Sequence, residues 1–175
     1  ILRARLDQGG KIVVTGVGKS GKIAQKIAAT LASTGSLAVF LHPTEGLHGD
    51  LGMVTPADVV LALSHTGNTD EILNLLPSLK SLGVPMIGIG GNPESRLARA
   101  SDAWVDARIE QEACPHNLAP TASTTLALAL GDALAVTLMN LRGFDQRSFA
   151  LNHPGGSLGR RLQLRVRDVM QPASL

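Results

Sequence analysis

The hydrophobic residues of this chain alternate between short, continuously apolar runs and longer segments in which they recur every three or four residues. Continuous apolar runs predict strands buried on both faces, and the helical spacing predicts helices that cover them. Ile23, Ile27 and Leu31 fall on one helical face, for example, and Gly35 is placed to end that helix. The predicted strands are 11–16, 37–41, 58–64, 84–90 and 103–106, and the predicted helices are 20–33, about 70–82, 94–100 and 121–141.

The regular alternation of strands and helices predicts an α/β fold with a parallel sheet and helices on both faces. Right-handed crossovers favour five strands in the flavodoxin-like order 2-1-3-4-5. Ligands in such sheets bind beyond the carboxyl ends of the first and third strands, where the strand order reverses. The turns that follow these strands, 16–21 and 64–69, are therefore expected to meet in space.

The turn after the first strand is rich in glycine and holds Lys19 just before a helix. A P-loop would need a glycine at position 13, where the chain has Val13. The dinucleotide fingerprint G-x-G-x-x-G is met by Gly16, Gly18 and Gly21. It also requires an acid after the second strand, but Leu41-His42-Pro43 stands there. We favour a small phosphorylated ligand that binds across several helix N-termini and faces Lys19.

Two further turns concentrate hydroxyl groups immediately before a helix. The turn after the third strand holds Ser64, Thr66 and Thr69, and 120–125 holds a second cluster. Plain N-capping of the helix would need only one hydroxyl, so the surplus favours a phosphate site. The candidate phosphate and substrate contacts are Gly18, Ser20, His48, Asp50, Ser64, His65, Thr66, Thr69, Ser123 and Thr124.

Composition narrows the classes of function. The 175 residues are enough for one domain, and 44% of them are hydrophobic, which suffices for a core. A net charge of +2 and 2% aromatic residues argue against a nucleic-acid partner. The single cysteine, Cys114, excludes a disulfide framework, suits a reducing cytoplasm and is expected to be a structural thiol. The apolar stretch 126–141 is interrupted by Asp132, which indicates a core helix rather than a membrane span.

The motif S-x-[ST]-G-x-T at 64–69 resembles the phosphosugar-binding turn of the sugar-isomerase (SIS) domain. The similarity extends to longer strings of the bacterial D-arabinose-5-phosphate isomerases within that family. These strings are 16–21, 48–53, 112–115, 118–125, 131–133 and 152–157. By this resemblance residues 1–163 are an SIS domain, and 164–175 begin a linker to CBS modules that the sequence lacks. His65 stands where relatives often carry a small polar residue, which adds a titratable group to the turn.

The resemblance implies that the chain interconverts arabinose 5-phosphate and ribulose 5-phosphate through an enediol, for the synthesis of KDO and lipopolysaccharide. The residues that match the family's catalytic set are Lys19, Glu71, Glu112 and His153. We expect Glu112, with a pKa raised by burial, to act as the carbon base and His153 as the acid, although the two roles could be reversed. Two other functions stay open: a non-catalytic module that senses a sugar phosphate, and an isomerase of another phosphosugar.

The same resemblance leads us to expect a cytoplasmic homotetramer in which more than one subunit completes each site. His48 and Asp50 are expected to contact sugar hydroxyls. The isomerisation requires no metal or cofactor. An inhibitory zinc ion at His48 and His153 is the metal alternative. No membrane or nucleic-acid partner is expected.

Overall fold

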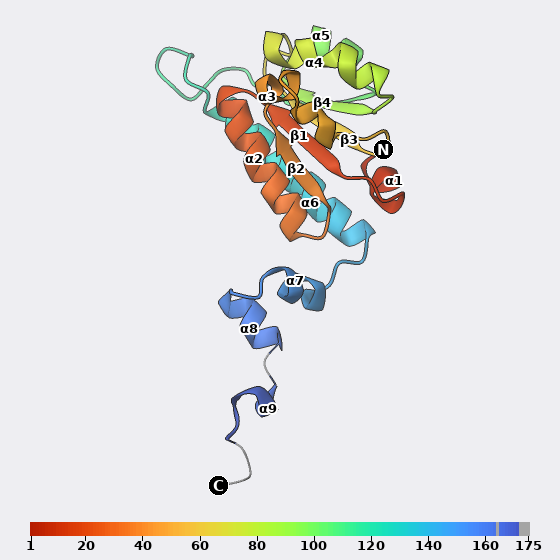
Figure 1. Ribbon diagram of the computed structural model, residues 1–175. Coiled ribbons are helices and arrows are strands. Elements are labelled where there is room, and N and C mark those ends of the chain that lie inside the picture. The colour runs from red at the N-terminus through yellow and green to blue at the C-terminus, as the bar shows by residue number, and fades with distance from the viewer. Residues whose placement is uncertain (164, 172–175) are drawn as a thin grey trace.

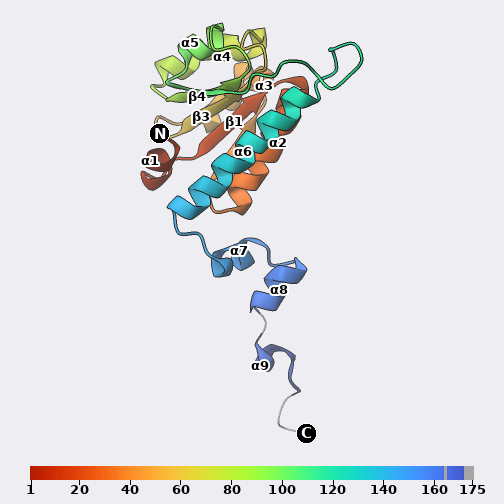
Figure 2. The same ribbon diagram turned by 180° about the vertical axis from the view of Figure 1, so that it is seen from behind.

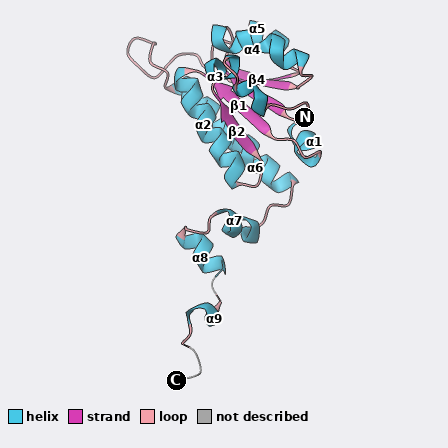
Figure 3. Ribbon diagram, viewed as in Figure 1, coloured by secondary structure: helices cyan, strands magenta, loops and turns pink. Residues whose placement is uncertain are grey.

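The computed structural model describes residues 1–163 and 165–171, and its centre is a five-stranded parallel sheet in the order β2-β1-β3-β4-β5 (Figure 3). The strands are β1 (Ile12–Gly16), β2 (Ala38–Leu41), β3 (Val59–Leu63), β4 (Met86–Gly90) and β5 (Ala103–Asp106). Every residue of β1, β3 and β4 is buried, as the continuous apolar runs predict. The predicted fold class and strand order are both confirmed.

Helices cover both faces of this sheet, and alternate strand residues supply two separate cores. The helices are α1 (Leu2–Asp7), α2 (Gly18–Ser33), α3 (Pro43–Leu47), α4 (Asp70–Ser81), α5 (Arg96–Ala100), α6 (Ala122–Leu141), α7 (Gln146–Asn152), α8 (Ser157–Gln163) and α9 (Val166–Val169). Val14 packs in one core with Ile27 of α2, whereas the adjacent Val13 packs in the other core with Leu75 of α4. Figures 1 and 2 show α2 and α6 on one side of the sheet and α3, α4 and α5 on the other.

Helix α6 packs against α2 at close range and leaves another face uncovered. A Cβ atom at Gly131 would overlap the side chain of Ile27, so glycine permits the close approach of the two helices. Val136 and Leu141 are each 51% exposed. By length and composition α6 could cross a membrane, and 22% of its apolar window is buried. The predicted core helix is therefore buried along one side only, and the other side is open apolar surface.

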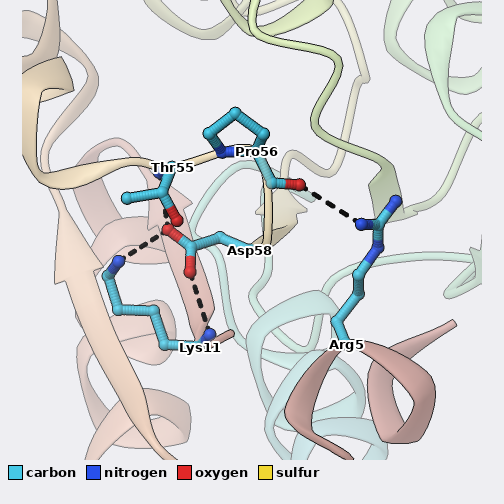
Figure 4. A network of polar contacts seen from close by, with 5 residues as sticks. All are labelled: Arg5, Lys11, Thr55, Pro56 and Asp58. Atoms are coloured by element: carbon cyan, nitrogen blue, oxygen red, sulfur yellow. Dashed lines mark hydrogen bonds and ion pairs between the residues drawn. The ribbon is translucent and has the colours of Figure 1, made fainter. Parts of the chain in front are cut away.

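A buried carboxylate joins the starts of β1 and β3 (Figure 4). Asp58 accepts hydrogen bonds from the backbone N–H of Lys11 at 2.9 Å and of Thr55 at 2.7 Å, and its carboxylate lies 2.6 Å from Lys11 Nζ. Burial by itself raises the pKa of Asp58, but the hydrogen bonds from Lys11 and Thr55 outweigh it, so the pKa lies below its usual value. The ionised carboxylate of Asp58 thus links the amino-terminal ends of β1 and β3, at the end of the sheet opposite the predicted site.

Residues 42–50, which follow the second predicted strand and belong to none of the predicted helices, contain helix α3 and the start of a 3-10 helix (Asp50–Met53). The His42 side chain accepts a hydrogen bond from the N–H of Thr44 at 3.3 Å, and Pro43 occupies the first helical position. Of the predicted linker 164–175, positions 164 and 172–175 lie outside the described residues, and α9 forms from the part between them. Figure 1 shows α7, α8 and α9 beyond the far end of α6.

Candidate active site

A cavity of about 490 Å³ lies at the carboxyl ends of β1, β3 and β4. Its walls come from the turn after β1, the turn after β3, the segment 107–120 and the first turns of α6. The apolar side chains of Ile23, Leu63 and Ile89 form part of its lining. The turns 16–21 and 64–69 therefore meet where the strand order reverses, as the sequence predicts.

The turn after β1 presents a cation to the cavity. Gly18 adopts a left-handed conformation (φ 58°) as α2 begins, which a residue with a side chain adopts only at a cost. The next two residues, Lys19 and Ser20, line the cavity. Lys19 lies at the positive end of the α2 dipole, an unfavourable place for a cation that has no anionic partner. This position suits a lysine whose partner is a bound anion.

The turn after β3 is organised by its own hydroxyl groups. Ser64 is buried, and its Oγ atom accepts the N–H of Gly67 at 3.0 Å and lies 2.8 Å from Thr69 Oγ1. Thr69 occupies the N-cap position of α4 but makes no side-chain hydrogen bond to the first helical turn. The Thr69 hydroxyl therefore does not cap α4, which was the alternative to a role in phosphate binding. His65 and Thr66 complete this side of the cavity.

Glu112 has a different environment from the one predicted. Its carboxylate accepts the backbone N–H of Thr121 at 2.9 Å, the N–H of Ser123 at 3.1 Å and the hydroxyl of Ser123. The hydrogen bond from the Ser123 hydroxyl, helped by the two backbone N–H groups, lowers the pKa of Glu112 to about 2. The expectation that burial raises the pKa of this glutamate is wrong. Glu112, Ser123 and Thr124 all line the cavity, but the hydroxyl of Ser123, an expected ligand contact, is directed to Glu112.

Four predicted site residues with ionisable side chains do not line the cavity within one chain. Glu71 is exposed in the first turn of α4, His48 ends α3, and Asp50 begins the 3-10 helix. His153 ends α7, at the opposite end of α6 from the cavity (Figure 2). Its Nδ1 atom lies 2.8 Å from the carbonyl oxygen of Phe149, and its ring stacks on the Phe149 ring at 3.9 Å. The structure brings Lys19, Glu112 and the turn 64–69 together at the cavity, whereas His153 contacts Phe149.

These positions do not support the alternative of a zinc ion bound by His48 and His153 of one chain. Helices α3 and α7, which end at His48 and His153, lie apart in both views, so the two imidazoles of one chain do not form a site (Figures 1 and 2). Within residues 1–163 and 165–171 no group of three or more His, Cys, Asp or Glu side chains is arranged to hold a metal ion.

The segment between β5 and α6 contributes more of the cavity lining than expected from the sequence. The additional residues are Ile109, Glu110, Gln111, Asn117, Leu118 and Pro120. Its length and polar content are unusual, but Glu112 is the only site residue that the sequence predicts within 107–120. The Cys114 thiol accepts the N–H groups of Ala119 at 3.2 Å and Leu118 at 3.1 Å, contacts that fit the expected structural role. The same hydrogen bonds lower its pKa, which favours the thiolate.

Residues 6–137 match the model of the SIS domain family, and the chain belongs to that family. The arabinose 5-phosphate isomerase KdsD of Pseudomonas aeruginosa is 60% identical over 161 residues, which cover 92% of this chain and 49% of that protein. KdsD of Escherichia coli strain K12 is 58% identical over the same coverage. The chain thus spans about half the length of these curated relatives.

A solved structure extends the similarity to three dimensions. The c3406 protein of E. coli CFT073, solved in complex with arabinose 5-phosphate, is 46% identical and superposes with a TM-score of 0.84. The match covers 87% of this chain and 80% of that one.

Proposed function

We propose that this chain is an aldose–ketose isomerase domain that interconverts D-arabinose 5-phosphate and D-ribulose 5-phosphate through an enediol. The observation that carries the proposal is the convergence of Lys19 and the Ser64–Thr69 turn on one cavity. Its volume of about 490 Å³ falls in the range of small-molecule sites. The identity of 58–60% to KdsD proteins adds support for the substrate.

The phosphate group is assigned to the side of the cavity between α2 and α4. The hydroxyls of Thr66 and Thr69 and the N-terminus of α4 offer donors and a favourable dipole to a dianion. Lys19 supplies a charge-assisted contact to the phosphate or to the developing enediolate. Gly18 and Ser20 shape the turn that holds Lys19, and His65, in the turn after β3, is proposed to contact the sugar.

The chemistry requires opening of the sugar ring, removal of the C2 proton and its return to C1, with a second proton moved between O1 and O2. An imidazole or a carboxylate close to these atoms can carry each proton. With a pKa of about 2, Glu112 stays ionised and suits neither the carbon base nor the acid role, so His153 is proposed as the carbon base. Glu71 is proposed as the group that relays the proton between oxygens.

These proton carriers require an assembly, because neither Glu71 nor His153 lines the cavity of its own chain. We propose a homotetramer in which His153 of one chain enters the cavity of another. The exposed apolar side chains of Val136, Leu141 and Leu151 provide a surface for such contacts. His48 and Asp50, both exposed, are proposed to contact sugar hydroxyls in the assembly.

The proposed setting is the cytoplasm, in the supply of KDO for lipopolysaccharide, by similarity to KdsD. The proposed reaction moves protons within one substrate and consumes no cofactor or metal.

The deciding experiment incubates the purified chain with arabinose 5-phosphate and measures the ketose formed. Formation of ribulose 5-phosphate supports the proposal. Binding of arabinose 5-phosphate without ketose formation would instead identify a sensing module. Faster turnover of a six-carbon phosphosugar than of the pentose phosphate would assign the chain to another isomerase.

A further inference from the structure

The first turn of α6 is capped from outside the helix. Thr121 occupies its N-cap position but makes no side-chain hydrogen bond to the first turn. The Oε2 atom of Glu112, nine residues earlier, accepts the N–H groups of Thr121 at 2.9 Å and Ser123 at 3.1 Å. The Glu112 Oε1 atom accepts the Ser123 hydroxyl. A carboxylate thus satisfies amides that the start of a helix otherwise leaves unpaired.

The same contact fixes the segment that forms one wall of the cavity. The N–H of Glu112 donates to Asn117 Oδ1 at 2.7 Å, and the N–H of Ala113 donates to Thr121 Oγ1 at 2.8 Å. Asn117 and Leu118 line the cavity within the loop that these bonds close. The position of the wall therefore depends on the link between Glu112 and the start of α6.

We infer that Glu112 is a positioning residue, which anchors the loop 112–121 to α6. Its carboxylate occupies the N-terminus of that helix as an internal anion. Proton abstraction from carbon is left to other groups. The internal anion also orients the substrate, since an occupied and negatively charged helix start repels a phosphate group. The phosphate is thereby directed to Lys19 and the Ser64–Thr69 turn. The inference deepens the proposed function and rests on it for the kinetic measurements alone.

The arrangement of donors distinguishes this role from that of a carbon base. Oε2 receives two backbone N–H bonds and lies 3.1 Å from Thr121 Oγ1, so the lone pairs of this oxygen are engaged, and Oε1 accepts the Ser123 hydroxyl. A base must approach the proton that it removes with a free lone pair, and it works best with a pKa near the working pH. The pKa of Glu112, lowered to about 2 by Ser123 and its neighbours, is far from that range.

Glutamine and alanine at position 112 separate the two roles. Glu112→Gln keeps an oxygen for the two backbone N–H groups, and the Ser123 hydroxyl can rotate to accept from the new amide. We expect kcat/KM for arabinose 5-phosphate to fall about tenfold or less in Glu112→Gln, but about 100-fold in Glu112→Ala, because a displaced wall misplaces the substrate. Loss of a base would cost about a thousandfold or more in both variants. The control is Glu94→Ala, because the Glu94 side chain is 83% exposed and does not line the cavity.

The pH dependence of kcat/KM distinguishes a base at position 112 from an anchor, because only a base changes it. Ser123→Ala removes the hydrogen bond that lowers the pKa of Glu112 most, so that pKa must rise. A base at position 112 would then shift the acid limb of the kcat/KM profile upward. We expect no shift, because the proposed base, His153, and the other titratable groups that line the cavity, Lys19, His65 and Glu110, are unchanged. A shifted limb overturns the inference.

Hydrogen exchange tests the anchor independently of turnover. The amides of Thr121 and Ser123 should exchange faster in Glu112→Ala than in the parent, and stay protected in Glu112→Gln. If the parent shows no isomerase activity, the proposed function fails while this comparison still judges the anchor. Unchanged protection in Glu112→Ala refutes the anchor. Near-complete loss of turnover in Glu112→Gln, with protection and arabinose 5-phosphate affinity retained, identifies Glu112 as the base instead.

Discussion

Ser64 follows β3 and Thr69 precedes α4, and their hydroxyl oxygens lie 2.8 Å apart. Ser64 Oγ also accepts the N–H of Gly67 at 3.0 Å, so a single buried hydroxyl holds the turn in shape. The turn can then direct its remaining hydroxyls and the amides at the start of α4 toward one anion. This bond between two side chains links the end of the sheet to the phosphate side of the cavity.

Ser64→Ala should raise KM for arabinose 5-phosphate about tenfold with a smaller effect on kcat. The buried N–H of Gly67 loses its side-chain acceptor and keeps only the Ser64 carbonyl oxygen at 3.2 Å, at a cost of about 0.5–1.5 kcal/mol, and the turn loosens. Steady-state kinetics on the pentose phosphate would measure the change. Ser81→Ala is the matched control, since its hydroxyl bonds Pro77 at the other end of α4. An unaltered KM in Ser64→Ala would argue against phosphate binding at this turn.

Lys19→Met should lower kcat/KM for arabinose 5-phosphate about 30-fold or more. A charge-assisted contact to phosphate or enediolate contributes about 2 kcal/mol, and about 1.4 kcal/mol corresponds to a tenfold change in rate. Lys22→Met serves as the control, because Lys22 is exposed on the same helix and contacts Gln25. Equal kinetics for Lys19→Met and the parent would remove Lys19 from the site.

Mixed assemblies test whether one site draws on two chains. If Lys19 and His153 of different chains form each site, Lys19→Met and His153→Ala chains are each inactive alone. Random mixing should restore about a quarter of the parental activity, since about one site in four receives both native residues. Co-refolded mixtures at equal concentration would be assayed beside size-exclusion chromatography. A fully active monomer, or a mixture no more active than its parts, would contradict a shared site.

Asp58→Asn should lower the free energy of unfolding by about 2–4 kcal/mol at pH 7, because Lys11 loses the carboxylate beside its 19%-exposed side chain. The folded-state pKa of Asp58 lies below its unfolded value of 3.8, so its stabilisation is full above that pH. The stabilisation is lost as the pH falls through the folded pKa, and parent and variant should converge there.

Urea unfolding of parent and Asp58→Asn between pH 2.5 and 7 would measure this convergence. Asp132→Asn is the control, since its pair with Lys26 is 41–45% exposed and should change stability by less than about 1 kcal/mol. A gap between parent and Asp58→Asn that is constant with pH would show that the carboxylate charge is not the cause.

The sheet and its order could be predicted from the chain alone, because buried strands and covering helices leave apolar patterns that are local in sequence. The meeting of the turns after β1 and β3 followed from general rules of α/β topology. Helix α3 was missed although its signals, Pro43 and an acid in the first turn, are local too. Those signals are short, and the helix itself has only five residues, too few for a repeating apolar pattern.

The state of Glu112 and the position of His153 could be decided only by tertiary structure. The pKa of a carboxylate depends on the donors that folding brings to it, and the donors to Glu112 lie nine and eleven residues away across a loop. Likewise, the sequence singled out His153 but could not indicate that α7, which His153 ends, lies beyond the far end of α6 (Figure 2). Local pattern therefore determines which elements form and in what order, whereas distances between segments determine which side chains can share a proton or a ligand.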